Sequence, residues 1–142
     1  MSGWLLDTVT VSELRKLTRA DARVIAWEKN TPGHRSWISV ITLNEIRTGV
    51  RQVERHDPGF AAKLDAWYYG LLLPNFQSRL LPVDQPVAEI AAEMRVTHGL
   101  SFNDALIAAT ACVHHLTLAT RNVSDFAHTG VAIVNPWAEY ER

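Results

Sequence analysis

Short apolar runs alternate with longer amphipathic stretches along this chain. The short runs are continuously apolar, which is typical of strands buried on both faces. We expect five strands, at residues 4–6, 36–41, 79–83, 116–119 and 131–134. Apolar positions spaced by three and four residues predict helices at residues 8–17, 20–30, 43–56, 60–73, 88–98 and 101–113. Alternating strands and helices favour an α/β fold with a mainly parallel, five-stranded sheet.

Capping residues set the expected ends of three helices. Thr42 has the side chain of an N-cap and precedes the helix at residues 43–56. Pro74 is expected to end the helix at residues 60–73. Gly99 is the expected C-cap of the helix at residues 88–98, because glycine readily adopts a left-handed conformation.

The helix at residues 101–113 carries one acidic residue at its start. Residues 105–113 are apolar on nearly every side, so this helix is predicted to be buried, with Cys112 packed inside. Asp104 shares a face with Ile107, Ala108 and Ala111. A carboxylate on such a face is costly unless it caps the helix or binds a cation. One interpretation is a capping box, with Ser101 as the N-cap; the other is a functional site.

Further polar residues follow the predicted strands. Asp7 ends the first strand, Glu45 follows the second within about one helical turn, and Asn122 and Asp125 follow the fourth. In open α/β sheets the functional site lies outside the carboxyl ends of the strands. Asp104 can reach the same edge of the sheet if the loop before its helix folds back over that edge.

Each of these polar residues also has a structural interpretation. Asp7 is a candidate N-cap, Glu45 a capping-box partner of Thr42, and Asn122 and Asp125 are common turn residues. The functional interpretation is a metal site, because clustered oxygen ligands suit Mg²⁺ or Mn²⁺ better than zinc. Crowded carboxylates also repel, so without a cation some should have raised pKa values. A metal held there would activate water and stabilise charge on a phosphodiester.

Composition narrows the class of protein. The chain has 142 residues, of which 47% are hydrophobic and 20% charged, which predicts one globular domain over residues 1–142. A net charge of −1 argues against broad electrostatic binding of nucleic acid but allows a local basic patch. With no signal peptide, membrane-spanning run or disulfide framework in the sequence, we expect a cytoplasmic protein without membrane association.

Five motifs occur in the order found in PIN-domain proteins, and the chain is most similar to the VapC and FitB toxins. The likeness runs from Trp4 to Trp137. The motifs are Leu5–Thr8 with Ser12–Leu14, Thr42–Gly49, Asp104–Ala111, Thr120–Asn122 and Asn135–Trp137.

This resemblance implies a three-layer α/β/α domain with Mg²⁺- or Mn²⁺-dependent endoribonuclease activity, the toxin of a type II toxin–antitoxin pair. The family's acidic positions fall on Asp7, Glu45, Asp104 and Asn122. It implies that Asp7 and Asp104 hold the metal and that Glu45 orients or deprotonates water. Asn122 or Asp125 completes the site, and Thr8 and Ser12 are additional hydroxyls or local caps.

The resemblance also implies partners. These are RNA, a second copy of the chain (and higher toxin–antitoxin assemblies), and a VapB-type antitoxin through which any DNA contact is made. Residues 67–73 are either part of an interface or core. The arginine stripe at positions 47, 51 and 55 is either an RNA-binding or a solvated face. The candidate RNA contacts are Arg15, Lys16, Arg47 and Arg121.

Two departures from the family pattern leave an alternative function. Val9 stands where the family usually has Asn, and Asn122 stands where many members have an acid. The alternative is a catalytically weakened PIN domain that serves as a protein- or RNA-binding module. A receiver domain is disfavoured because no lysine follows Lys63, and a haloacid-dehalogenase fold because Asp7 lacks a second aspartate two residues later.

Overall fold

A five-stranded sheet forms the centre of the molecule. The computed structural model describes residues 2–138. All neighbouring strands are parallel, in the order β3-β2-β1-β4-β5. The strands are β1 (Trp4–Leu6), β2 (Ser36–Ser39), β3 (Leu80–Leu81), β4 (Thr117–Ala119) and β5 (Ile133–Val134). The predicted α/β fold and five-stranded parallel sheet are therefore confirmed, with β2, β3, β4 and β5 shorter than expected.

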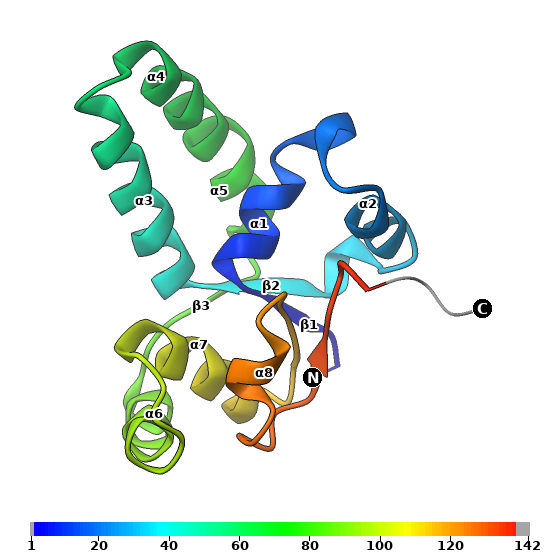
Figure 1. Ribbon diagram of the computed structural model, residues 1–142, viewed down its shortest axis with the longest axis vertical. Helices are drawn as coiled ribbons and strands as arrows, with labels where there is room; N and C mark the ends of the chain where they lie inside the picture. Colours follow the sequence, from blue (N-terminus) through cyan, green and yellow to red (C-terminus); the bar gives the residue numbers. More distant parts are fainter. Residues whose placement is uncertain (1, 139–142) are drawn as a thin grey trace.

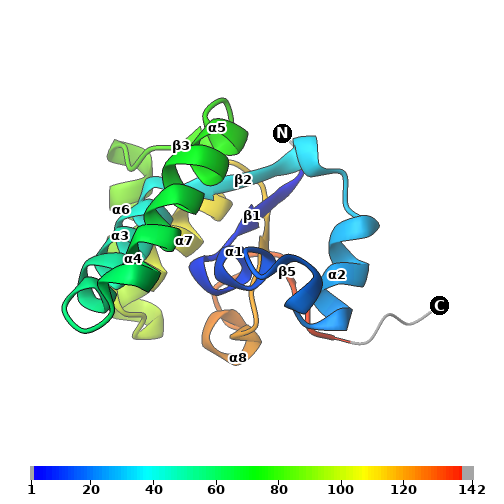
Figure 2. The ribbon, with the colours of Figure 1, turned by 90° about the horizontal axis from the view of Figure 1, so that it is seen from above.

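Helices cover both faces of the sheet (Figure 1). The first group lies on one face, and in Figure 2 α1 stands between the α3–α4 pair and α2. It comprises α1 (Thr8–Leu14), α2 (Ala22–Lys29), α3 (Val40–Glu54), α4 (Pro58–Trp67) and α5 (Leu73–Phe76), with short 3₁₀ turns at Leu17–Arg19 and Gly33–Arg35. The second group covers the opposite face and comprises α6 (Gln85–His98), α7 (Phe102–Val113) and α8 (Val123–Phe126). No helix within residues 2–138 is both long enough and apolar enough to cross a membrane.

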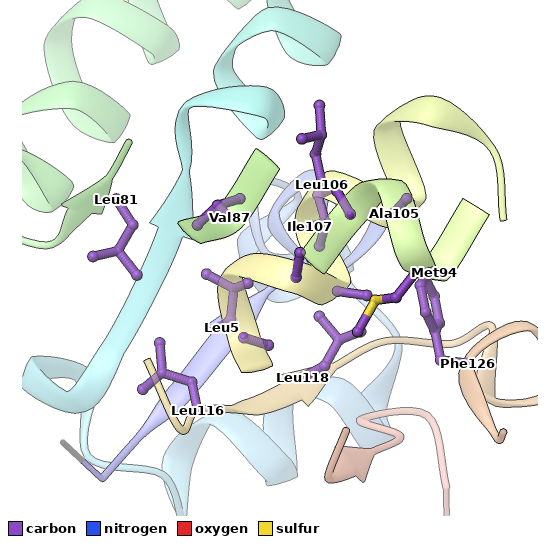
Figure 3. Packing of buried hydrophobic residues seen from close by; sticks show 14 residues of the cluster. Leu5, Leu81, Val87, Met94, Ala105, Leu106, Ile107, Leu116, Leu118 and Phe126 are labelled. Atoms are coloured by element: carbon purple, nitrogen blue, oxygen red, sulfur yellow. The ribbon is translucent and has the colours of Figure 1, made fainter. Parts of the chain in front are cut away.

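Alternation along the strands produces two hydrophobic cores. Leu5 and Leu118 pack with α6, α7 and α8 on one side of the sheet (Figure 3). Leu6 and Ala119, the next residues along the same strands, pack with α1 to α5 on the other side. Successive side chains of a strand point to opposite faces, so continuously apolar strands support a core on each face. This arrangement is the predicted α/β/α layering.

Helix α7 is buried along most of its length. Every residue of 105–111 is buried, as the all-round apolar pattern predicts. Four of these are alanines, whose small side chains allow close packing against α6 and the sheet. Cys112 is exposed, so the prediction that it packs inside was wrong. The buried part of the helix ends at Ala111, one residue before it.

Helix α3 begins earlier than expected. Ser39, the last residue of β2, is the N-cap, and its Oγ accepts a hydrogen bond from the Ile41 backbone N–H at 3.0 Å. The prediction that Thr42 caps this helix was therefore wrong, and the capping-box interpretation of Glu45 fails with it. Thr42 is instead completely buried in the first turn. Glu45 lies in the second turn of the helix.

The helix predicted to end before Pro74 continues through it to Phe76. Residues Tyr68–Leu72 form a π-helical segment, in which the Leu73 N–H donates to the Tyr68 carbonyl. This widened turn directly precedes the proline, which has no N–H of its own to donate. Tyr68 and Leu72 are buried, whereas Tyr69 and Leu71 are exposed, so this segment is core on one side and surface on the other.

Candidate functional site

Asp7 leaves the carboxyl end of β1 and is the N-cap of α1. Its Oδ1 atom accepts hydrogen bonds from the Thr10 backbone N–H at 2.9 Å and from Thr10 Oγ1 at 2.7 Å. The structural interpretation of Asp7 is therefore correct. It does not exclude a second role, because Oδ2 accepts no hydrogen bond from the described residues. Asp7 is nevertheless buried, which fixes this carboxylate firmly at the sheet edge.

Glu45 is tied to the residue that follows Asp7. Thr8 Oγ1 donates to Glu45 Oε1 at 2.6 Å. The Thr8 hydroxyl also lies 3.2 Å from the hydroxyl of the buried Thr42. The first turn of α1 and the beginning of α3 are thus joined by side chains. Thr8 therefore contacts one of the predicted acids, whereas Ser12 has no side-chain hydrogen bond to these acids among residues 2–138.

Asp104 lies in the first turn of α7, where Ser101 is the N-cap as predicted. The Asp104 backbone N–H donates to Ser101 Oγ at 3.3 Å. The pKa of Asp104 is raised, chiefly because partial burial disfavours the charged carboxylate. The negative charges of Glu45 and Asp125 raise this pKa further, while a hydrogen bond from Ser101 opposes the shift. Negative charges from α3 and α8 therefore act on Asp104 in α7.

Asn122 and Asp125 lie after β4, at the start of α8. Asn122 occupies the N-cap position, but its side chain makes no capping hydrogen bond, and it is exposed. The Asn122 backbone N–H instead donates to Thr120 Oγ1 at 3.0 Å. Asp125 is also exposed, and its charge, like that of Glu45, raises the pKa of Asp104.

A cavity of 610 Å³ opens beside Asp104 and Asp125. It lies between the end of α6, the start of α7 and α8, and His98 and His128 contribute to its lining. Neither histidine belongs to a sequence motif, so no pattern in the chain indicated that they line this cavity. A second cavity, of 630 Å³, is lined by α1, α2 and α4–α5 and contains none of the four predicted acidic positions.

The carboxylate and amide oxygens at the carboxyl edge of the sheet are of the kind that bind a hard cation such as Mg²⁺. Among residues 2–138, no group of three or more His, Cys, Asp or Glu side chains is close enough together to enclose a metal ion. Mg²⁺ commonly uses only one or two protein carboxylates and completes its coordination with water and substrate phosphates. Asp7, with a free Oδ2, and Asp104, in a negative environment, fit that mode of binding.

Two of the predicted RNA-binding cations are held by acidic neighbours. Arg47 forms an ion pair with Asp65, and its guanidinium lies 5.1 Å from the ring centres of both Tyr68 and Tyr69. Lys16 pairs with Glu13 at 2.9 Å. The other two lie against aromatic rings, Arg15 over Phe60 and Arg121 over Trp137.

Comparison with known proteins places this architecture in a family. Residues 5–131 match the model of the PIN domain. The chain is 38% identical to "Toxin FitB" of Neisseria gonorrhoeae, with 94% of this chain and 97% of the relative covered. It is 33% identical to "VapC ribonuclease Y4jK" of Sinorhizobium fredii, over 94% of this chain and 96% of the relative.

A solved structure agrees with these relatives. The structure of FitAB bound to an IR36 DNA fragment matches with a TM-score of 0.86 and 36% identity, over 97% of this chain and 98% of the other. The family inferred from the five motifs is confirmed by both comparisons. The chain belongs to the PIN-domain family, among its toxins of the VapC and FitB type.

Proposed function

We propose that this protein is a metal-dependent endoribonuclease and the toxin of a type II toxin–antitoxin pair. The observation that carries the proposal is the hydrogen bond of 2.6 Å from Thr8 to Glu45, which holds this acid beside the strand end that carries Asp7. The negative charges of Glu45 and Asp125 also raise the pKa of Asp104. The similarity to VapC ribonuclease Y4jK supports RNA as the substrate.

Each side chain has a role that fits its surroundings. Asp7 and Asp104 would hold Mg²⁺ or Mn²⁺, directly or through water. The ion would polarise the scissile phosphate and stabilise the leaving oxygen. Glu45 would orient or deprotonate the attacking water, while the Thr8 hydroxyl fixes the position of Oε1. Asp125, whose charge reaches Asp104, is better placed electrostatically than Asn122 to complete the site.

The proposed partner is a VapB-type antitoxin, which inhibits the enzyme and provides any contact to DNA. The similarity to FitAB, solved on a DNA fragment, supports this assembly. The proposed oligomer is a homodimer, which can join into larger toxin–antitoxin complexes. The test is co-expression with the neighbouring upstream reading frame, which should relieve growth arrest; arrest that persists would count against an antitoxin there.

Activity is tested with the purified chain and a pool of structured RNA. Cleavage should occur with Mn²⁺ or Mg²⁺, stop in EDTA, and be lost in Asp7→Ala. Thr10 would lose its capping partner in that variant, so circular dichroism must show that the variant is folded. If folded wild-type protein free of antitoxin cleaves no RNA, the alternative of a binding module is favoured.

A further inference from the structure

The cavity beside Asp104 has a mixed polar lining. Asp104 and Asp125 contribute carboxylates, and the hydrogen-bond donors include His98, His128 and Ser124. Its volume of 610 Å³ falls within the range of about 300–1,000 Å³ typical of small-ligand sites. The cavity therefore has room for a nucleotide next to an acidic residue of the site.

Three of its donors are available to a ligand. The side chains of His98, His128 and Ser124 have no hydrogen-bond partner within residues 2–138. All three are exposed. A neutral imidazole carries one N–H donor, so the two histidines can donate without being protonated.

An RNA substrate needs such donors here. Its phosphates are negatively charged and must come close to carboxylates that repel them. No Lys or Arg occurs among the described residues that line this cavity. The two imidazoles and the Ser124 hydroxyl, together with the hydroxyl of Thr97, are thus side chains suited to hold phosphate oxygens on this side of Asp104.

We propose that this cavity binds the nucleotide next to the scissile phosphate, with His98, His128 and Ser124 donating hydrogen bonds to its phosphate oxygens. This subsite rests on the proposed endoribonuclease function. The histidines are positioning residues for RNA, and they take no part in the hydrolysis itself. Their removal should affect binding of substrate and leave the chemical step unchanged.

The test uses His98→Ala, His128→Ala and the double variant, because alanine has no side-chain donor. The matched control is His56→Ala, which changes an exposed histidine just after α3 that does not line the cavity. Binding of a short fluorescent single-stranded RNA is measured by anisotropy with Ca²⁺ in place of Mg²⁺. Steady-state cleavage of an RNA cut by the wild-type protein gives KM and kcat separately.

Each single variant should weaken RNA binding and raise KM by about tenfold, the size of one hydrogen bond to a charged group. The double variant should weaken both further, with kcat within about twofold of wild type in every variant. His56→Ala should behave like wild type. Three results would each overturn the subsite. The first is RNA affinity and KM equal to wild type in both cavity variants, and the second is an equal loss of affinity at His98, His128 and His56. The third is a wild-type protein that does not bind RNA.

The two proposals fail in different ways. If the wild-type protein cleaves RNA and the cavity variants match it, the nuclease function holds and the subsite is wrong. If the wild-type protein binds RNA without cleaving it, and the cavity variants bind more weakly, the subsite holds and the nuclease function is wrong.

Discussion

Thr8 and Glu45 meet through a hydrogen bond of 2.6 Å between their side chains. They are 37 residues apart in the chain and belong to different helices, α1 and α3. The bond holds one oxygen of Glu45 next to the strand end that carries Asp7. This fixed orientation is the preorganisation that the catalytic role proposed for Glu45 would need.

Replacing Thr8 by valine tests this orientation. Thr8→Val keeps the side-chain shape but removes the hydroxyl, so Glu45 loses its donor. We expect kcat for RNA cleavage to fall about tenfold with KM nearly unchanged, a loss typical of one hydrogen bond to a charged group. Thr8→Ser restores the hydroxyl and should recover most of the activity. Equal kcat values for the valine variant and wild type would show that this hydrogen bond does not assist the reaction.

Asp104→Asn should abolish metal-dependent cleavage and leave the fold intact. The amide keeps the size of the side chain but removes the charge that would attract the cation. Activity is measured with Mn²⁺, and far-ultraviolet circular dichroism checks the fold. His56→Gln provides a control from a distant exposed site. Unchanged cleavage by folded Asp104→Asn would exclude a metal-binding role for this residue.

The raised pKa of Asp104 also predicts a dependence of stability on pH. The native state favours the protonated carboxyl, so between the unfolded and folded pKa values it binds more protons than the unfolded chain. The contribution of Asp104 to the free energy of unfolding in EDTA should therefore decrease as pH rises through that window. Asp104→Asn should unfold at a higher temperature than wild type at neutral pH, and the difference should shrink below the ordinary aspartate pKa of 3.8. A variant less stable than wild type at neutral pH would contradict this sign.

Asn122→Asp should tighten the binding of Mn²⁺. The added carboxylate restores the acid that many PIN domains have at this position and increases the negative charge of the site. Calorimetry with Mn²⁺ measures the change, and Asp125→Asn should shift affinity in the opposite direction. No change in Asn122→Asp, with a loss in Asp125→Asn, would assign the fourth position to Asp125.

Leu118→Ala tests the core beneath the site. Leu118 is completely buried on β4, so the substitution should lower the free energy of unfolding by about 2–5 kcal/mol. Val96→Ala is the control, because Val96 is 89% exposed and its loss should change stability by less than about 0.5 kcal/mol. Urea denaturation followed by tryptophan fluorescence measures both. Similar values for the two variants would contradict the assignment of Leu118 to the core.

The strands and the burial of α7 could be predicted from the sequence, because both depend on local apolar patterns. The polar residues at the carboxyl ends of the strands could be predicted because they directly follow those apolar runs. It did not reveal that Ser39 caps α3, since serine and Thr42 are both good caps and only the backbone decides between them. The hydrogen bond from Thr8 to Glu45 and the place of His128 in the cavity depend on packing between distant segments. Such contacts leave no periodic signal in the chain.

The burial of α7 has a consequence for how this site can change during evolution. Residues 105–111 face packed neighbours on every side, so most substitutions near Asp104 would disturb the core as well as the chemistry. Helix α8 has only four residues and an exposed first turn, so substitutions there cost little stability. We therefore expect amino-acid substitutions in the site to be more frequent in and around α8 than in α7. Asn122, one of the two positions that depart from the family pattern, lies on that permissive side.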